Sequence, residues 1–100
     1  MKYNKLVRDK IPAYIRGKGE TAVTHIAGDA EYWAKLKEKL QEEITEFEQE
    51  ANTEELADIL EVLDAIIDYK QFNRAEIAKI KTDKAEKRGK FQERIILEES

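Results

Sequence analysis

The chain contains no cysteine, a single proline and a single histidine among its 100 residues. The lack of cysteine excludes a disulfide framework, thiolate metal ligands and a cysteine nucleophile. No apolar run approaches the length of about 20 residues that spans a membrane. The basic residues of the N-terminus are not followed by the apolar segment of a signal peptide. We therefore expect a cytoplasmic protein with no membrane partner.

Charge is what the chain has in abundance. Charged residues make up 40% of it, hydrophobic residues 41%, and the formal net charge is −4. High charge with helical periodicity and one proline indicates a mainly all-α fold. A chain this short predicts one domain over residues 1–100, and its thin core favours a homodimer or higher homo-oligomer. The negative net charge argues against a nucleic acid polymer as partner.

Two amphipathic helices are predicted on either side of a break at Asn52-Thr53. The first extends from about Ala30 to Glu50, and the second ends near Tyr69-Lys70. The second is apolar over a wider arc, as expected for a helix that packs on two sides. The lysines of the first helix alternate with glutamates, which suits exposed positions. The apolar stripe of the first helix follows steps of three and four: Trp33, Leu36, Leu40, Ile44, Phe47 and Ala51.

Shorter elements are predicted toward the two ends of the chain. Pro12 to Gly17 fits a short helix, and a further helix opens at Asn73 and ends at Gly89. Residues 21–27 and 91–97 are rich in β-branched side chains and predict a short two-strand pairing that ties the ends together. Such an isolated pair is marginal without helices to pack on.

Acidic residues at helical spacing flank the central break. They are Glu42, Glu43 and Glu46 before the break, and Glu55, Asp58 and Glu61 after it. Residues three or four apart share one helix face, so a helical hairpin brings the pairs Glu43/Glu46 and Glu55/Asp58 together. Four crowded carboxylates repel one another unless a cation lies between them. Hard oxygen ligands of this charge suit Mg²⁺, with Mn²⁺ as the alternative.

The residues alone leave other interpretations open. Glutamate-rich surface helices show the same spacing without binding a metal, as a solvated acidic face. Glu55, three residues after Asn52, also fits a capping box, in which it caps a helix instead of holding a metal. At the level of function, the alternative is a non-catalytic helical association module or a nucleotide sensor.

Basic residues are concentrated at both ends of the chain. They include Lys5, Arg8 and Lys10 near the N-terminus, and Lys84 and Arg88 in the last predicted helix. They are either solvated surface charges or contacts to the outer phosphates of a metal-bridged polyphosphate. The chain has no phosphate-cradling glycine loop, no ExxH pair and no Ser-His-Asp set. Metal-assisted phosphoanhydride hydrolysis is therefore the most economical chemistry.

Three segments carry a resemblance to a known family. They are EExxE at Glu42–Glu46 with ExxD at Glu55–Asp58, KLVRDKIP at Lys5–Pro12, and KAEKRGKF at Lys84–Phe91. Together they resemble the MazG-like all-α nucleoside triphosphate pyrophosphohydrolases, which include phosphoribosyl-ATP pyrophosphohydrolase, and in particular a small house-cleaning branch. Two departures are the short span of eight residues between Glu46 and Glu55, and Lys90 where a second glycine is expected.

The resemblance implies a helical fold that assembles as a dimer or higher oligomer. It also implies Mg²⁺-dependent hydrolysis of a nucleoside triphosphate or related nucleotide to the monophosphate and pyrophosphate, in the house-cleaning of non-standard nucleotides. Carried over residue by residue, the Mg²⁺ ligands are Glu43, Glu46, Glu55 and Asp58, with Glu42 close by in support. The candidate catalytic residues are Glu42 and Glu43. The candidates for phosphate contacts, chosen on charge and position, are Lys5, Arg8, Lys10, Lys84 and Arg88.

Overall fold

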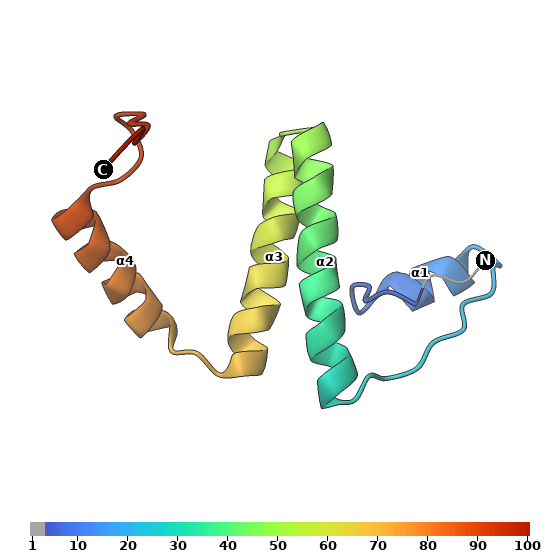
Figure 1. Cartoon of the computed structure of the whole chain (residues 1–100). Helices are drawn as coiled ribbons and strands as arrows, with labels where there is room; N and C mark the ends of the chain where they lie inside the picture. Colours follow the sequence, from blue (N-terminus) through green and yellow to red (C-terminus); the bar gives the residue numbers. More distant parts are fainter. Residues whose placement is uncertain (1–3) are drawn as a thin grey trace. The chain divides into compact units, whose positions relative to one another are not determined.

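The computed structural model describes residues 4–100 and is all-α in this range (Figure 1). Its helices are α1 (Ile11–Gly17), α2 (Asp29–Gln49), α3 (Thr53–Lys70) and α4 (Arg74–Arg88). The predicted fold class is thereby confirmed. The chain divides into two compact units, Met1–Ile66 and Ile67–Ser100. Among the helices of residues 4–100, none has both the length and the apolar character needed to cross a membrane.

The predicted strand pairing is wrong. Residues 21–27 and 91–97 are irregular, and the described part of the chain contains no strand. Val23 is 93% exposed, and Phe91 is 97% exposed. Because their side chains bury almost nothing, the β propensity of these runs has no packed surface on which a sheet can form.

The first unit is built around the antiparallel hairpin of α2 and α3, whose helices lie side by side (Figure 1). Among the described residues, its buried apolar side chains are Leu36 of α2 and Val62 of α3. The first turn of α2 carries two acidic residues, which favour a helix N-terminus. At the start of α3, the Asn52 side chain accepts a hydrogen bond from the Glu55 N–H at 2.9 Å. These local signals explain why the observed ends lie close to the predicted ones.

α1 and the chain before it complete the first unit. α1 begins at Ile11 with Pro12 in its first turn, and Gly19 follows it at a positive φ of 82°. Only a glycine adopts this conformation without strain, which explains where the helix stops. Residues 4–10 carry the basic side chains that reach the α2–α3 hairpin.

The second unit contains the end of α3 and the whole of α4. Asn73 caps α4 by accepting a hydrogen bond from the Glu76 N–H at 2.9 Å, and Gly89 ends it at a φ of 82°. Both ends of this helix were predicted from the sequence and are confirmed. Lys84 and Arg88 are exposed on α4.

Candidate metal centre and adjoining pocket

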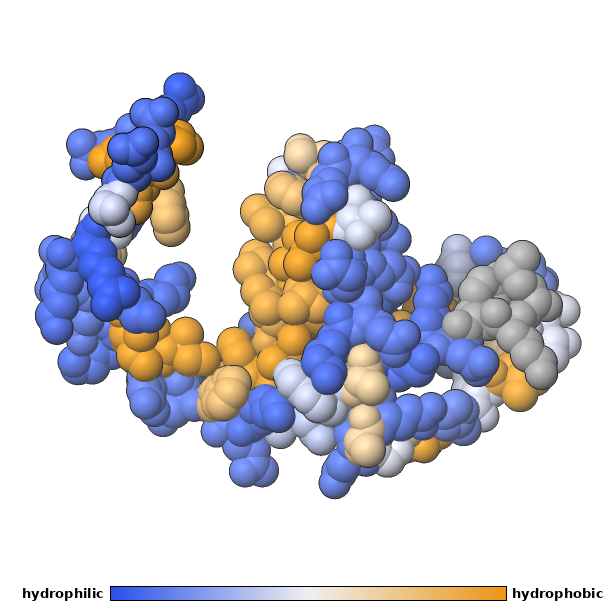
Figure 2. Space-filling view, in the orientation of Figure 1, coloured by the Kyte–Doolittle hydropathy of each residue, from blue (hydrophilic) through white to orange (hydrophobic). Residues whose placement is uncertain are grey.

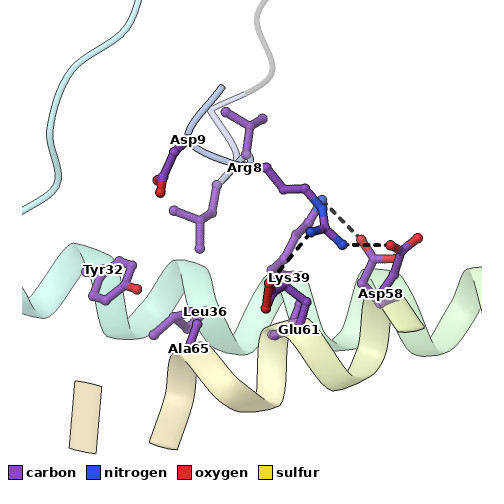
Figure 3. Close-up of a pocket in the computed structure, with 12 residues that line it drawn as sticks. Arg8, Asp9, Tyr32, Leu36, Lys39, Asp58, Glu61 and Ala65 are labelled. Atoms are coloured by element: carbon purple, nitrogen blue, oxygen red, sulfur yellow. Dashed lines mark hydrogen bonds and ion pairs between the residues drawn. The ribbon is translucent and has the colours of Figure 1, made fainter. Parts of the chain in front are cut away.

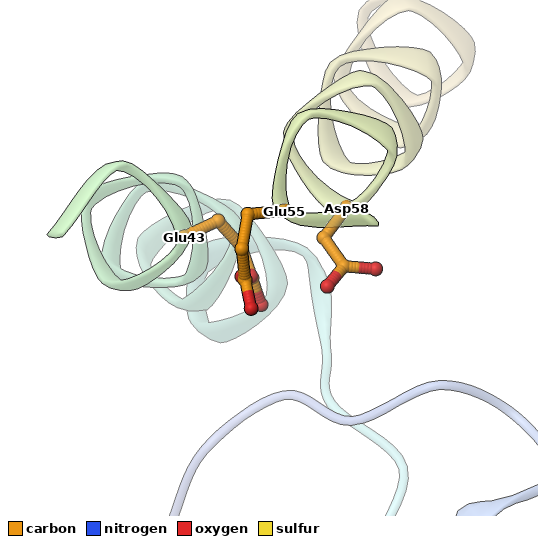
Figure 4. Close-up of side chains that lie close together, drawn as sticks. All are labelled: Glu43, Glu55 and Asp58. Carbon is orange, nitrogen blue, oxygen red and sulfur yellow. The ribbon is translucent and has the colours of Figure 1, made fainter. Parts of the chain in front are cut away.

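Three carboxylates converge where α2 and α3 face each other. Glu43 comes from α2, and Glu55 and Asp58 come from the first two turns of α3. Each offers one oxygen, and these oxygens all lie within 4.8 Å of one another. Figure 4 shows the three side chains pointing into the same space. We call Glu43, Glu55 and Asp58 the carboxylate cluster.

Two oxygens of the carboxylate cluster are buried without a partner. Glu43 is only 6% exposed, and its Oε1 lies 3.2 Å from Lys39 Nζ. The Oε2 atoms of Glu43 and Glu55 are buried and accept no hydrogen bond. A buried carboxylate oxygen without a partner costs stability, so such atoms call for an ion or water to satisfy them. Three carboxylates in one place, two of which have an oxygen without a partner, offer hard oxygen donors of the kind that suit Mg²⁺ or Mn²⁺.

Burial and the charges of neighbouring acids raise the pKa of two glutamates at this site. Burial raises the pKa of Glu55, and the neighbouring charges of Asp58 and Glu43 raise it further. Burial also raises the pKa of Glu46, together with a hydrogen bond to Glu43 and the charge of Glu43. Burial is the largest cause of both shifts, and repulsion between the ionised acids adds to it. A bound cation would relieve this repulsion.

Glu46 lies three residues after Glu43 and is partly buried. It contributes no oxygen to the carboxylate cluster but is close enough to interact with Glu43. The structure therefore brings three of the four predicted metal ligands together and places the fourth beside them.

Glu55 takes part in the cap of α3 through its main chain, and its carboxylate lies in the carboxylate cluster. Asn52 caps α3 through the main-chain N–H of Glu55. The N–H of Asn52 donates to the Glu50 carbonyl oxygen at 2.9 Å, so the return bond of a capping box is not needed. This leaves the Glu55 carboxylate in the cluster (Figure 4).

Two of the predicted phosphate contacts lie against acidic side chains. Lys5 Nζ is 3.1 Å from Glu42 Oε1, and Arg8 Nη2 is 2.8 Å from Asp58 Oδ1. Arg8 Nη1 also lies 3.8 Å from Glu61. The other three predicted contacts are exposed: Lys10 precedes α1, and Lys84 and Arg88 belong to the second unit.

Sequence reasoning missed Lys39, which it assigned to an exposed position. Only 18% of its side chain is exposed, and its Nζ lies 3.5 Å from Glu42 and 3.2 Å from Glu43. The signal was present in the spacing, because residues three and four apart on a helix pair in this way. Partial burial raises the pKa of Glu42, but the hydrogen bond from Lys5 and the charges of Lys39 and Lys5 outweigh it, so this pKa is lowered.

A pocket of about 250 Å³ adjoins the carboxylate cluster and shares Glu43 and Asp58 with it (Figure 3). The N-terminal segment, α2 and α3 form its walls. Its lining combines apolar side chains and one tyrosine with charged groups: Leu6, Val7, Tyr32, Leu36, Val62 and Ala65 with Arg8, Asp9, Lys39 and Glu61. A concave site of this kind suits a small molecule with an apolar part and a charged part.

We expect Glu46→Gln to stabilise the protein at pH 7 when no divalent cation is present. Because the pKa of Glu46 is raised in the folded state, its protonated form contributes stability below the ordinary value of 4.5. That contribution is lost as the pH rises through the folded-state pKa. A like-charge helix pair costs about 0.2–0.5 kcal/mol, so the melting temperature should rise by about 1–4 °C.

Thermal melts followed by circular dichroism check this expectation. The gain should shrink toward pH 4, where wild-type Glu46 is protonated as well. Glu48→Gln, at an exposed position of the same helix, is the matched control and should show a smaller change. A melting temperature that falls in Glu46→Gln at pH 7 would contradict the repulsion inferred for these acids.

Comparison with known proteins yields a partial match. The chain is 52% identical over 42 residues to an uncharacterized protein of Mycolicibacterium smegmatis. The match covers 42% of this chain and 43% of that protein, so it spans less than half of either. No protein-family model matches the chain. No solved structure matches it either.

Proposed function

We propose that the protein is a Mg²⁺-dependent nucleotide pyrophosphohydrolase, with Mn²⁺ as an alternative metal. Its substrate is a nucleoside triphosphate or related nucleotide, and its products are the monophosphate and pyrophosphate. The observation that carries the proposal is the carboxylate cluster, with oxygens within 4.8 Å of one another and two buried oxygens that lack a partner. The resemblance of three segments to MazG-like pyrophosphohydrolases supports it, as does the role of that family in clearing non-standard nucleotides.

The acidic side chains in and around the carboxylate cluster have different roles in the proposed reaction. Glu43, Glu55 and Asp58 would hold Mg²⁺, which would supply Lewis-acid chemistry toward phosphate oxygens. Glu42 has both oxygens paired with lysines and a lowered pKa, which suits an orienting role. Glu46 lies beside Glu43 and outside the cluster, which places it to accept a proton from a water molecule.

The adjoining pocket provides room for the rest of the nucleotide. Its apolar wall and Tyr32 suit the nucleoside, and Lys39 and Arg8 lie at the charged end beside the carboxylate cluster. A nucleotide placed in this way has its phosphates next to Glu43 and Asp58. The basic side chains then contact the outer phosphates.

A nucleotide panel tests the proposal. Pyrophosphate release is measured from standard and modified nucleoside triphosphates with Mg²⁺, with Mn²⁺ and with EDTA. We expect release from at least one nucleotide with either metal and none with EDTA. Absence of pyrophosphate from every nucleotide in both metals would reject the proposed enzyme.

A second copy of the chain is the proposed partner for the outer face of α3. Leu56, Leu60 and Leu63 lie at steps of four and three and are 46%, 54% and 38% exposed. Figure 2 shows apolar side chains gathered along this helix. A twofold contact would bury these leucines on both chains, which favours a homodimer. The same face also favours the alternative function, a helical association module that forms the dimer without releasing pyrophosphate.

We expect Leu60→Gln to weaken the dimer by about 10-fold or more. Fully burying a leucine contributes about 1.5–3 kcal/mol, Leu60 is 54% exposed before association, and a twofold interface loses the corresponding part of this contribution on both chains. Light scattering coupled to size exclusion, over a dilution series, measures the change. Leu97→Gln, which alters an exposed leucine near the C-terminus, is the control and should leave the dimer intact. A wild-type chain that is monomeric throughout would reject the proposed partner.

A further inference from the structure

The N-terminal segment is held on the hairpin by ion pairs between residues far apart in the sequence. Lys5 reaches Glu42 across 37 positions, and Arg8 reaches Asp58 across 50 positions. We call residues 4–9 the strap. Leu6, Val7, Arg8 and Asp9 of the strap also line the pocket beside the carboxylate cluster (Figure 3).

Asp58 belongs to both arrangements. One of its oxygens lies within 4.8 Å of the oxygens offered by Glu43 and Glu55, and its Oδ1 lies 2.8 Å from Arg8 Nη2. A guanidinium and a divalent cation both bind a carboxylate by neutralising its charge, so each lowers the attraction of Asp58 for the other. The two side chains are 56% and 39% exposed, which leaves this ion pair free to exchange with ions from solvent.

We propose that Arg8 is the counter-ion of Asp58 in the metal-free protein, and that a divalent cation displaces Arg8 from this ion pair. Cation binding to the carboxylate cluster then weakens the hold of the strap on the hairpin and opens the wall of the pocket that the strap forms. The displaced guanidinium becomes available to an anionic ligand. This inference rests on the cation site of the proposed function and adds a regulation to that site. Linkage makes the effect reciprocal, because the factor by which the strap weakens cation binding equals the factor by which the cation weakens the strap.

Mn²⁺ binding in the absence of nucleotide measures the first half of this linkage. The free-Mn²⁺ signal in electron paramagnetic resonance gives the dissociation constant for the whole chain. Exposed ion pairs are weak, so Arg8→Gln should bind Mn²⁺ about 2–5-fold more tightly than wild type. Arg8→Lys keeps the charge but lacks the planar fork, and its affinity should lie between the two. Lys18→Gln removes one exposed positive charge from the end of α1 and should match wild type.

Hydrogen exchange of the strap measures the second half and does not depend on a variant. The amides of Leu6 to Asp9 should exchange faster in wild type with Mg²⁺ than without it. Unchanged or slower exchange at saturating Mg²⁺ would overturn the proposed displacement of Arg8, as would equal Mn²⁺ affinity in Arg8→Gln and wild type. Absence of Mn²⁺ binding to both proteins would instead reject the cation site, and with it the proposed function.

Discussion

Glu43→Gln is expected to lower Mg²⁺-dependent pyrophosphate release by about 100-fold or more. Glu43 is the ligand that α2 contributes to the carboxylate cluster, and one of its oxygens is buried without a partner. Glutamine keeps the size of the side chain but removes the charge that would hold the cation. The variant should still fold, because the change relieves repulsion from Glu46 and Glu55.

The matched control for this prediction is Glu48→Gln. Glu48 lies on the same helix at an exposed position and belongs to neither the cluster nor the pocket. Its activity should remain within about twofold of wild type, since surface substitutions away from a site have small effects. Asp58→Asn should lose activity as Glu43→Gln does. A folded Glu43→Gln protein that keeps more than a tenth of wild-type activity would reject Glu43 as a ligand.

Mg²⁺ alone is expected to raise the melting temperature of the wild-type protein. At ten times its dissociation constant, a ligand that binds only the folded state adds about 1.4 kcal/mol. For a chain of this size, that corresponds to a rise of about 6–11 °C. The rise should be absent in Glu43→Gln. Circular dichroism melts with and without Mg²⁺ measure it.

Ionic strength must be matched with NaCl in these melts, because the net charge of −4 makes the chain responsive to general screening. If Mg²⁺ stabilises Glu43→Gln as much as wild type, the cation binds elsewhere. If it stabilises neither protein beyond the NaCl control, the carboxylate cluster is a repulsive acidic face and the proposed chemistry has no metal.

The helices were predictable because their signals are local. The first long helix was expected from about Ala30 to Glu50 and is found as Asp29–Gln49, since an apolar stripe and a break define it. Asn73 and Gly89 defined α4 through capping chemistry alone. The prediction of strands at 21–27 and 91–97 was wrong because β structure depends on long-range pairing and a packed face, which local propensity does not report.

In the candidate site, too, the features with local sequence signals were predictable and those that depend on long-range contacts were not. Spacing brought Glu43, Glu55 and Asp58 together, because the helical period and the turn at Asn52 fix their positions. The pairing of Arg8 with Asp58 depends on the path that the N-terminal segment takes over the hairpin. No local pattern predicts that path. Arg8 was therefore predicted as a phosphate contact, whereas in the structure it forms an ion pair with Asp58.

The most direct test of the central claim is the ³¹P spectrum of the wild-type protein incubated with Mg²⁺ and a nucleoside triphosphate that the panel identifies as substrate. We predict that the signals of the monophosphate and of pyrophosphate grow together, with twice the intensity for pyrophosphate because it carries two equivalent phosphorus atoms, which marks cleavage between the α and β phosphates. These signals should be missing with Glu43→Gln. Orthophosphate with the diphosphate, or an unchanged triphosphate, would contradict the claim that the carboxylate cluster supports pyrophosphate release.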